Sequence, residues 1–307
     1  MKIKDNGILI LVICALLWSM GGVLCKLVQW DGICISGTRS FVAGITMCIL
    51  LRTRPVVYCK NVDQQTGKST VNKKQTLNMW IAAICYSATM ISYVVANKLT
   101  SSANAILLQY TSPVYIIIFG PWLLKEKNRL SDYLCLIGVL FGMVLFFTNS
   151  LGGGNFWGDM ISVLSGITWG FSTIFLRRTG DKYSFNAFIL AHIITFLVSL
   201  PFIVMSIESM SIESNGMVSR LTCVGILIMG IFQIGLPSIL YAAGLSKVRA
   251  LTANFIAMIE PIMTPVWVAI FVGEKIYWNT VVGGILVIGC ILLRSVFQHF
   301  GAKKKLC

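Results

Sequence analysis

Charged residues are scarce in this chain of 307 residues, of which only 12% are Asp, Glu, Lys or Arg. About a quarter of the residues of a soluble domain are charged, so the composition excludes an ordinary soluble fold. Its apolar runs also lack the polar alternation of a membrane-spanning β-barrel. Each is long enough to cross about 30 Å of hydrocarbon as a helix. The sequence therefore predicts an all-α integral membrane protein.

The residue types and motifs used in catalysis and metal binding are also scarce. The chain has only 2 histidines, and it has no CxxC, HExxH, Cys/His cluster or plausible Ser-His-Asp set. The 10 cysteines lie mostly within apolar segments and fit packing better than a zinc site or disulfide framework. We therefore expect no metal, no cofactor and no enzymatic activity.

A glycine run at Gly152–Gly154 lacks the lysine and the strand-to-helix context of a phosphate-binding loop. We expect it to form a turn between two halves of the chain.

The formal net charge of +14 does not predict a nucleic-acid partner, because the lysines and arginines lie between apolar segments. That placement is typical of the cytoplasmic loops of membrane proteins, so the expected surrounding is a lipid bilayer. The basic end of the chain, Lys303–Lys305, fits either a topology signal or contact with anionic lipid.

Ten apolar segments have the length of membrane-spanning helices. We expect them at residues 8–28, 33–51, 77–96, 102–124, 130–149, 157–176, 184–206, 221–243, 250–272 and 276–296. With the N-terminus in the cytoplasm, 20 of the 25 basic residues fall on the cytoplasmic side. This asymmetry predicts a multi-pass protein of the cell membrane with both termini cytoplasmic. The polar segment from Arg52 to Thr76 is expected to be a flexible cytoplasmic linker.

The stretch Tyr93–Lys127 recurs 148 positions later as Tyr241–Lys275, with a proline inside each copy, Pro113 and Pro261. Mid-helix prolines are unusual, so two in register indicate duplication. Five predicted spans precede the glycine turn and five follow it. An odd number per unit inserts the second copy upside down. Inverted repeats of this kind build many secondary transporters, with the substrate site near mid-membrane between them.

Several motifs recur in both halves. Each opening span carries a tryptophan, Trp18 or Trp169, and the second span carries Arg39. Two further segments join a polar start, a proline and an acid: Ser101–Asn104, Pro113 and Glu126 in the first copy, and Leu251–Asn254, Pro261 and Glu274 in the second.

With these motifs the chain resembles the EamA-type transporters of the drug/metabolite transporter superfamily. The resemblance covers residues 8–149 as a first repeat and 157–296 as a second. It implies ten transmembrane helices in two inverted five-helix repeats. It also implies export or exchange of small organic metabolites, often amino acids. A facilitative uniporter, an importer and a non-transporting receptor are the alternatives.

Glu260 lies about mid-membrane in its span, where an ionised group is costly unless it is paired or hydrated. It is a candidate for proton coupling or for binding a substrate ammonium. The alternative is a structural acid that pairs with a base or binds backbone groups freed by Pro261. The first copy has Ser112 where the second has Glu260, so only one acid is available at this depth.

Arg39 could bind a substrate carboxylate, pair with Glu260 or extend to the outer surface. His192 is a candidate proton relay, with a buried, hydrogen-bonded histidine as the alternative.

Pro113 and Pro261 are candidate hinges, because each leaves a carbonyl without its helical partner, at Gln109 and Ala257. A free carbonyl within the membrane needs another partner or a polar cavity, which marks this neighbourhood as a candidate substrate site. Neutral hydrogen-bonding groups are supplied there by Gln109, Tyr110 and Asn254. Trp18 and Trp169 are candidates for stacking on an apolar substrate, with plain packing as the alternative.

Small residues such as Gly138, Gly142 and Gly283 predict close helix packing, either within the bundle or in a homodimer.

Overall fold

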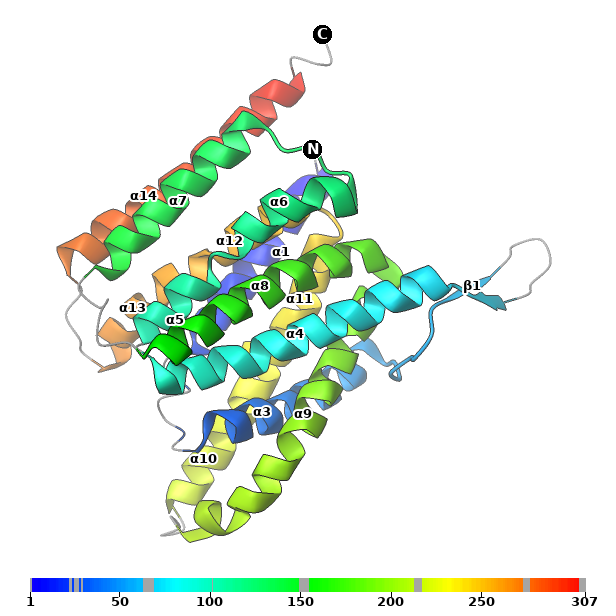
Figure 1. Ribbon diagram of the computed structural model, residues 1–307, viewed down its shortest axis with the longest axis vertical. Coiled ribbons are helices and arrows are strands. Elements are labelled where there is room, and N and C mark those ends of the chain that lie inside the picture. The colour runs from blue at the N-terminus through cyan, green and yellow to red at the C-terminus, as the bar shows by residue number, and fades with distance from the viewer. Residues whose placement is uncertain are drawn as a thin grey trace.

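The computed structural model describes residues 2–21, 24, 28, 30–62, 69–100, 102–148, 155–212, 217–272 and 277–303. Helices form a bundle in which distant segments of the chain lie side by side (Figure 1). The predicted turn at Gly152–Gly154, and the acid Glu274, lie outside the described residues.

Each predicted span overlaps one or more helices of the structure. Their bounds are α1 Lys2–Ser19, α3 Gly32–Leu51, α4 Lys73–Leu99, α5 Ser102–Gln109, α6 Ser112–Leu124, α7 Leu130–Phe147, α8 Phe156–Thr179, α9 Asp181–Ile212, α10 Met217–Ile228, the π-helix η1 Met229–Gly235, α11 Leu236–Leu245, α12 Ala250–Ala257, α13 Ile259–Val272 and α14 Trp278–Lys303.

Among the described residues, 8 helical segments are long and apolar enough to cross a membrane. Shorter apolar helices at Gly7–Ser19 and Ala250–Thr264 occupy the places of the first and ninth predicted spans. The protein is thus a multi-pass helical membrane protein, and the count of ten spans stays a prediction.

Two of the predicted spans are discontinuous. α5 ends at Gln109 and α6 begins at Ser112, while α12 ends at Ala257 and α13 begins at Ile259. Each proline lies in the first turn after its break, where a missing N–H costs no helical hydrogen bond. The prolines therefore begin new helices instead of bending continuous ones.

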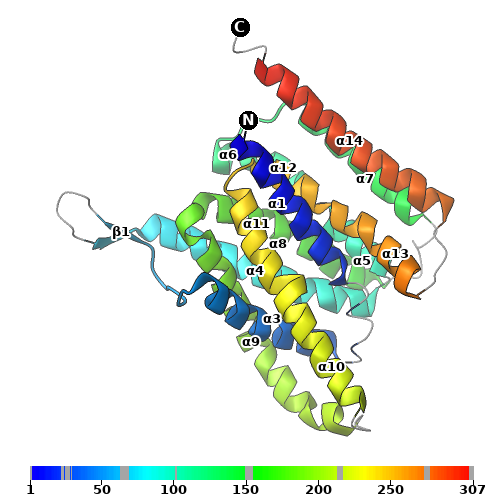
Figure 2. The same ribbon diagram turned by 180° about the vertical axis from the view of Figure 1, so that it is seen from behind.

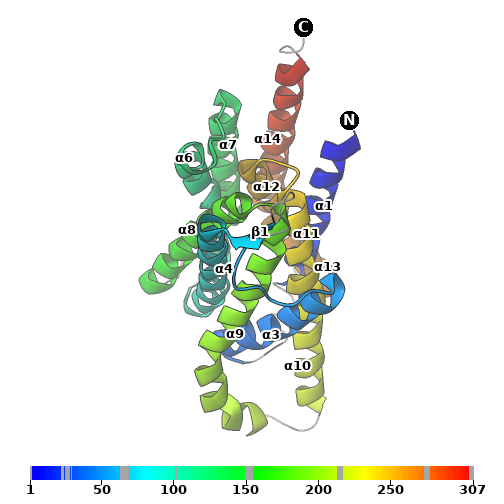
Figure 3. The same cartoon turned by 90° about the vertical axis from the view of Figure 1, so that its right-hand side faces the viewer.

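The helices pack in layers that bring the two halves of the chain together. α4 packs along α8 in the centre, and α1 lies beside α11 (Figure 2). α7 and α14 form a pair at one end of the molecule, and α3 packs on α9 toward the other (Figure 3). Since α7, α3 and α4 precede residue 150 and their partners follow it, the core is shared between the halves.

Glycines allow the close approach of α7 and α14. A Cβ added at Gly138 would lie 2.5 Å from Sγ of Cys290, and one added at Gly283 would lie 2.5 Å from the backbone nitrogen of Phe146. These glycines therefore pack helices of the same chain against each other, which was the first of the two interpretations offered by the sequence. A homodimer contact stays a prediction.

The segment 52–76 is more ordered than the sequence predicts, and the expectation of a flexible linker is wrong for its described part. Lys60–Val62 (β1) and Ser69–Val71 (β2) pair as antiparallel strands. The hydroxyl of Tyr183 on α9 exchanges hydrogen bonds of 2.8 and 2.9 Å with the backbone of Lys60. The side-chain amide of Asn186, also on α9, likewise accepts a hydrogen bond from the backbone N–H of Val56 and donates one to its carbonyl oxygen. Tertiary hydrogen bonds therefore supply an order that the polar composition does not reveal.

Candidate functional site

Glu260 and Tyr110 meet where the two broken spans face each other. The hydroxyl of Tyr110 lies 2.5 Å from Oε2 of Glu260 and 3.2 Å from the carbonyl oxygen of Ala257. Ala257 is the last residue of α12, so its carbonyl has no partner within that helix. Tyr110 is only 3% exposed, whereas Glu260 is partly buried. One tyrosine hydroxyl therefore lies within reach of both the carboxylate and the open carbonyl at the second helix break.

Neutral polar groups extend this contact between the breaks. The hydroxyl of Ser112 at the start of α6 donates to Oδ1 of Asn254 on α12 over 2.8 Å. Oε1 of Gln109 accepts a hydrogen bond of 3.2 Å from Ser165 on α8. Gly166 on α8 is tightly apposed to the break, since a Cβ added there would lie 2.8 Å from the carbonyl oxygen of Gln109. Both prolines thus lie beside a polar seam that joins the first and second halves.

Trp18 and Trp169 pack against each other beside this seam. Their ring centroids are 5.5 Å apart in an edge-on arrangement, and both contact Tyr241 at 5.2 and 5.0 Å. Tyr86 adds a fourth ring, 5.8 Å from Trp169. All four side chains are buried. This contact joins α1, α4, α8 and α11 in one aromatic cluster, which fits the packing interpretation; stacking on a substrate stays a prediction.

Arg39 on α3 is buried, with 2% of its surface exposed. It does not extend to the surface. Its Nη1 lies 3.5 Å from Oε1 of Gln233, within the π-helix η1. Gly230 permits this approach, because a Cβ there would lie 2.4 Å from Cβ of Val42 on α3. Among the described residues no ion pair joins Arg39 to Glu260, although the charge of Arg39 acts on Glu260 and on His192.

His192 is fully buried on α9. Its Nε2 lies 3.2 Å from the hydroxyl of Ser238 on α11, and that hydroxyl lies 3.5 Å from the hydroxyl of Tyr86. The imidazole also packs edge-on against the ring of Tyr86, with centroids 5.7 Å apart. The sequence interpretation of a buried, hydrogen-bonded histidine describes this arrangement, and a proton-relay role stays a prediction.

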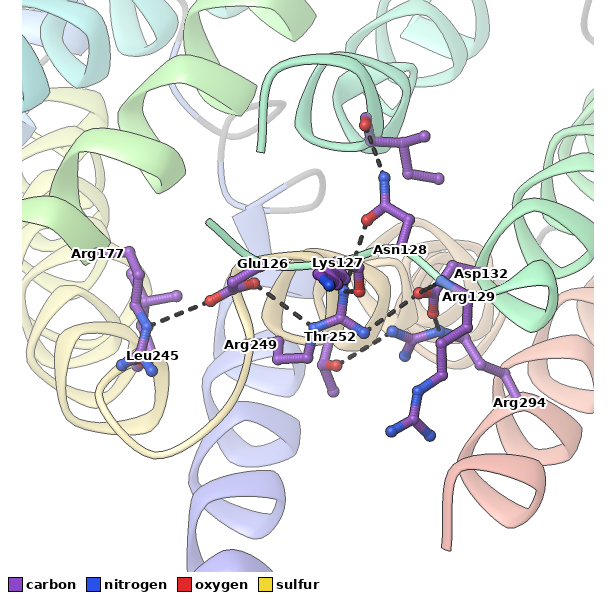
Figure 4. Close-up of polar contacts among 11 residues, drawn as sticks. Glu126, Lys127, Asn128, Arg129, Asp132, Arg177, Leu245, Arg249, Thr252 and Arg294 are labelled. Carbon is purple, nitrogen blue, oxygen red and sulfur yellow. Dashed lines mark hydrogen bonds and ion pairs between the residues drawn. The ribbon is translucent and has the colours of Figure 1, made fainter. Parts of the chain in front are cut away.

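A second polar assembly joins the halves at the end of the bundle that carries the segment Lys125–Arg129 (Figure 4). Glu126 contacts Arg177 and Arg249, each at 3.6 Å. Arg249 also pairs with Asp132 at 3.2 Å. It donates a hydrogen bond of 2.9 Å to the carbonyl oxygen of Lys127. We call Glu126, Asp132, Arg177, Arg249 and Arg294 the charged network. Two acids of the first half are thereby held by three arginines of the second.

The charged network has a buried part and a partly exposed part. Asp132 and Arg294 pair at 2.7 Å, with side chains only 0% and 1% exposed. The side chains of Glu126, Arg177 and Arg249 are 19%, 31% and 27% exposed. The Asp132–Arg294 pair also lies within the tight α7–α14 contact, and Arg294 stacks over the ring of Phe255 at 4.9 Å. The ion pairs of Glu126 are longer and more exposed to solvent than the Asp132–Arg294 pair. They are therefore the weaker part of the charged network and separate more readily.

Sequence reasoning treated Arg177, Arg249 and Arg294 only as topology signals, and it missed Asp132 and Gln233. One signal was present in the sequence. Asp132 is the third residue of its helix and Arg294 falls near the end of the last predicted span. In a bilayer, opposite charges at one membrane face can pair. Gln233 between Gly230 and Gly235 was likewise visible as an amide within an apolar run.

Comparison with known proteins assigns the chain to a family. The family model of the EamA-like transporter family matches residues 5–148 and again 156–296. The chain belongs to the EamA-like transporter family. The resemblance to the drug/metabolite transporter superfamily is thus confirmed, and the fold contains two EamA repeats.

Individual relatives agree with this assignment. The EamA chain is 24% identical over 233 residues to an uncharacterized transporter of Clostridium kluyveri, covering 73% of this chain and 71% of the relative. It is 19% identical over 259 residues to the uncharacterized transporter YoaV of Bacillus subtilis, covering 82% of this chain and 83% of the relative.

A solved crystal structure shares the fold. It matches with a TM-score of 0.74 at 14% identity, over 95% of this chain and 98% of the other. Membership in a transporter family supports a transport role and suggests that the protein is not an enzyme.

Proposed function

We propose that this EamA protein is a secondary transporter that exports small organic metabolites, amino acids or related compounds, across the cytoplasmic membrane by alternating access. The observation that carries the proposal is the Glu260–Tyr110 contact, which places an acid between two broken helices. Broken helices at mid-membrane expose backbone groups that can bind polar solutes or ions, and inverted repeats place such breaks at the substrate site. The inverted arrangement of residues 8–149 and 157–296, and the cytoplasmic position of both termini, are part of the proposal.

Each polar group near the breaks has an assigned role in this proposal. Glu260 binds the substrate ammonium or carries the coupled proton, and Tyr110 orients its carboxylate. Arg39 binds a substrate carboxylate through its planar fork. Gln109, Asn254 and the carbonyl of Ala257 supply neutral hydrogen-bonding groups. Trp18 and Trp169 form the apolar wall, and Pro113 and Pro261 mark the positions at which the half-helices tilt.

The charged network closes the cytoplasmic side in this proposal. Its ion pairs join the first repeat to the second at the end of the bundle that the proposal assigns to the cytoplasm. An opening toward the cytoplasm must therefore separate Glu126 from Arg177 and Arg249. The α7–α14 contact with its Asp132–Arg294 pair remains fixed.

The proposal is tested in two steps. A metabolite-wide comparison of medium from cells with and without the protein identifies the compounds that accumulate outside. Flux of those compounds is then measured in proteoliposomes containing the purified chain. Accumulation together with flux supports an exporter. Flux that proceeds equally in both directions without a pH gradient indicates a uniporter, depletion from the medium indicates an importer, and no flux of any compound indicates a receptor.

A further inference from the structure

The connection between α3 and β1, residues 52–59, has three consecutive apolar side chains on its surface. Val56, Val57 and Tyr58 are 38%, 47% and 56% exposed. A run of three exposed apolar residues is unfavourable in water unless it forms a contact. The position of this run in the molecule therefore needs an explanation.

The α3–β1 connection is held in place through its backbone. The N–H and carbonyl of Val56 both form hydrogen bonds with the side chain of Asn186 on α9. The carbonyl of Val57 accepts a hydrogen bond of 3.1 Å from the indole N–H of Trp80 on α4. Because these contacts fix the backbone, the exposure of the apolar side chains is a property of the folded chain.

The same two partners place the connection at the level of the membrane face. Asn186 lies about 7.5 Å along α9 from its start, and Trp80 about 10 Å along α4, at 1.5 Å per residue. Trp80 is also nearly one turn further into its span than Leu77, an apolar residue that is 60% exposed. The headgroup layer on each side of the hydrocarbon is about 5–7 Å thick. A segment bonded to these helical turns therefore lies at the depth of the headgroups.

Basic residues surround the exposed apolar run. Residues 52–76 include six basic residues and one acid, Asp63, which lies outside the described residues. The basic residues that the structure describes are all exposed, and they are Arg52, Arg54, Lys60, Lys73 and Lys74. Within the described part of the chain, none of them forms an ion pair. Their charges are thus available to an external anion.

The two lysines of α4 stand where helix stability does not favour them. Lys73 and Lys74 are the first residues of the helix, and its first turn has no acid. The positive end of the helix dipole is at this terminus, so bases here are unfavourable and anions are favourable. An anionic partner outside the chain accounts for their position.

We propose that the α3–β1 connection and its basic neighbours bind anionic phospholipids of the leaflet on this side of the membrane. Val57 and Tyr58 enter the boundary between headgroups and acyl chains, where apolar and aromatic side chains are favoured. Arg52 and Arg54 pair with the lipid phosphate. A free anion in water would satisfy the charges but would leave the apolar run in water, so the two features together favour a lipid.

Two matched pairs of basic residues separate this surface from the general positive charge of the same face. Arg52 and Arg54 follow α3, whereas Lys125 and Lys127 follow α6, and all four are exposed. Arg52 and Lys125 both end their helices in the left-handed conformation, with φ of 49° and 58°. α3 and α6 end at the same face, because the single span α4 returns the chain between α3 and the broken span α5–α6.

The experiment introduces the photoreactive amino acid benzoylphenylalanine at position 58 of the full chain and, as a control, at position 70. Tyr58 and Thr70 are both exposed, but Thr70 lies in the projecting hairpin (Figure 1). The purified chain is placed in nanodiscs of equal parts phosphatidylglycerol and phosphatidylcholine with the same acyl chains. After irradiation, mass spectrometry counts the lipid adducts at each position.

We expect lipid adducts at position 58 and none at position 70. Phosphatidylglycerol adducts should exceed phosphatidylcholine adducts about fivefold, which corresponds to about 1 kcal/mol, the attraction of one basic residue to an anionic membrane surface. Arg52→Gln combined with Arg54→Gln should lower this ratio to about two or less. Lys125→Gln combined with Lys127→Gln removes the same charge and should leave the ratio unchanged.

Four outcomes overturn the proposal. The absence of lipid adducts at position 58 shows that the connection faces water. Equal adducts of the two lipids show that no anionic headgroup is selected. The same ratio in both double variants shows only the general field of a basic face. Crosslinks from position 58 to a second copy show that another chain covers the surface. None of these readouts requires transport, so they are independent of the proposed function.

Discussion

The contacts of Glu260 bear on whether it is a structural or a functional acid, the two roles that the sequence leaves open. The single O–H of Tyr110 lies within hydrogen-bond distance of both the Glu260 carboxylate and the Ala257 carbonyl at the end of α12, so these two acceptors share one donor. The Ala257 carbonyl thus lies against Tyr110, and no hydrogen bond joins it to Glu260 among the described residues. Glu260 therefore stays a candidate for binding a substrate ammonium or carrying the coupled proton.

Glu260→Gln tests this role. The amide keeps the shape and can still accept a hydrogen bond from Tyr110, so the fold should survive. It cannot lose or gain the coupled proton. We expect proton-driven flux in proteoliposomes to fall at least tenfold, and the remaining flux to be insensitive to a pH gradient. Unchanged rate and pH dependence would show that Glu260 is structural.

Arg39→Lys tests the assignment of the carboxylate partner. Lysine keeps the charge but loses the planar fork that binds both carboxylate oxygens. We expect binding of an amino-acid substrate to weaken about tenfold, whereas its amide derivative binds as before; competition in the flux assay measures both. Equal losses for acid and amide would refute carboxylate binding by Arg39.

At the scale of elements, the linker between α6 and α7 holds the end of the bundle together. The linker supplies Glu126 and the start of α7 supplies Asp132, and their arginine partners come from α8, the α11–α12 connection and α14. Removing one partner of a buried pair costs about 3–5 kcal/mol, whereas an exposed pair contributes at most about 1 kcal/mol. The Asp132–Arg294 pair therefore fits a fixed support, and the Glu126 pairs fit a contact that opens in each cycle.

Glu126→Gln tests the opening. Loss of about 1 kcal/mol shifts a two-state equilibrium about fivefold. We expect the buried residue at position 253, changed by Ala253→Cys, to react about fivefold faster with an impermeant maleimide in inside-out vesicles. Lys127→Gln removes a neighbouring charge that forms no side-chain pair among the described residues, so it is the control. The same rate in both variants would contradict the proposed closure.

At the scale of the whole molecule, the β1–β2 hairpin is a suitable place to measure the orientation of the protein in the membrane. The hairpin projects from the start of α4, and Ser69 within it is exposed (Figure 1). It belongs to the segment that the positive-inside asymmetry places in the cytoplasm.

Ser69→Cys tests the topology. We expect an impermeant thiol reagent to label this position in inside-out vesicles and not in intact cells, with the parent chain as the background for the native cysteines. Labelling of position 69 in intact cells would reverse the proposed orientation of every helix.

The sequence alone determined the membrane class, the duplication and the family. Long apolar runs, prolines in register and basic loops are properties of the chain read in order, because a membrane constrains each spanning segment separately. The approximate positions of the helices and of both proline breaks were therefore predictable. Glu260, Arg39 and His192 were selected for the same reason, since each is an ionisable residue within an apolar run.

Only the tertiary structure decided the partners. That Tyr110 rather than Arg39 contacts Glu260, and that three arginines of the second half hold Glu126 and Asp132, depends on which helix faces lie together. The hairpin in segment 52–76 depends likewise on Tyr183 and Asn186 of α9. These contacts join residues more than 50 positions apart, and local patterns of hydrophobicity do not specify them.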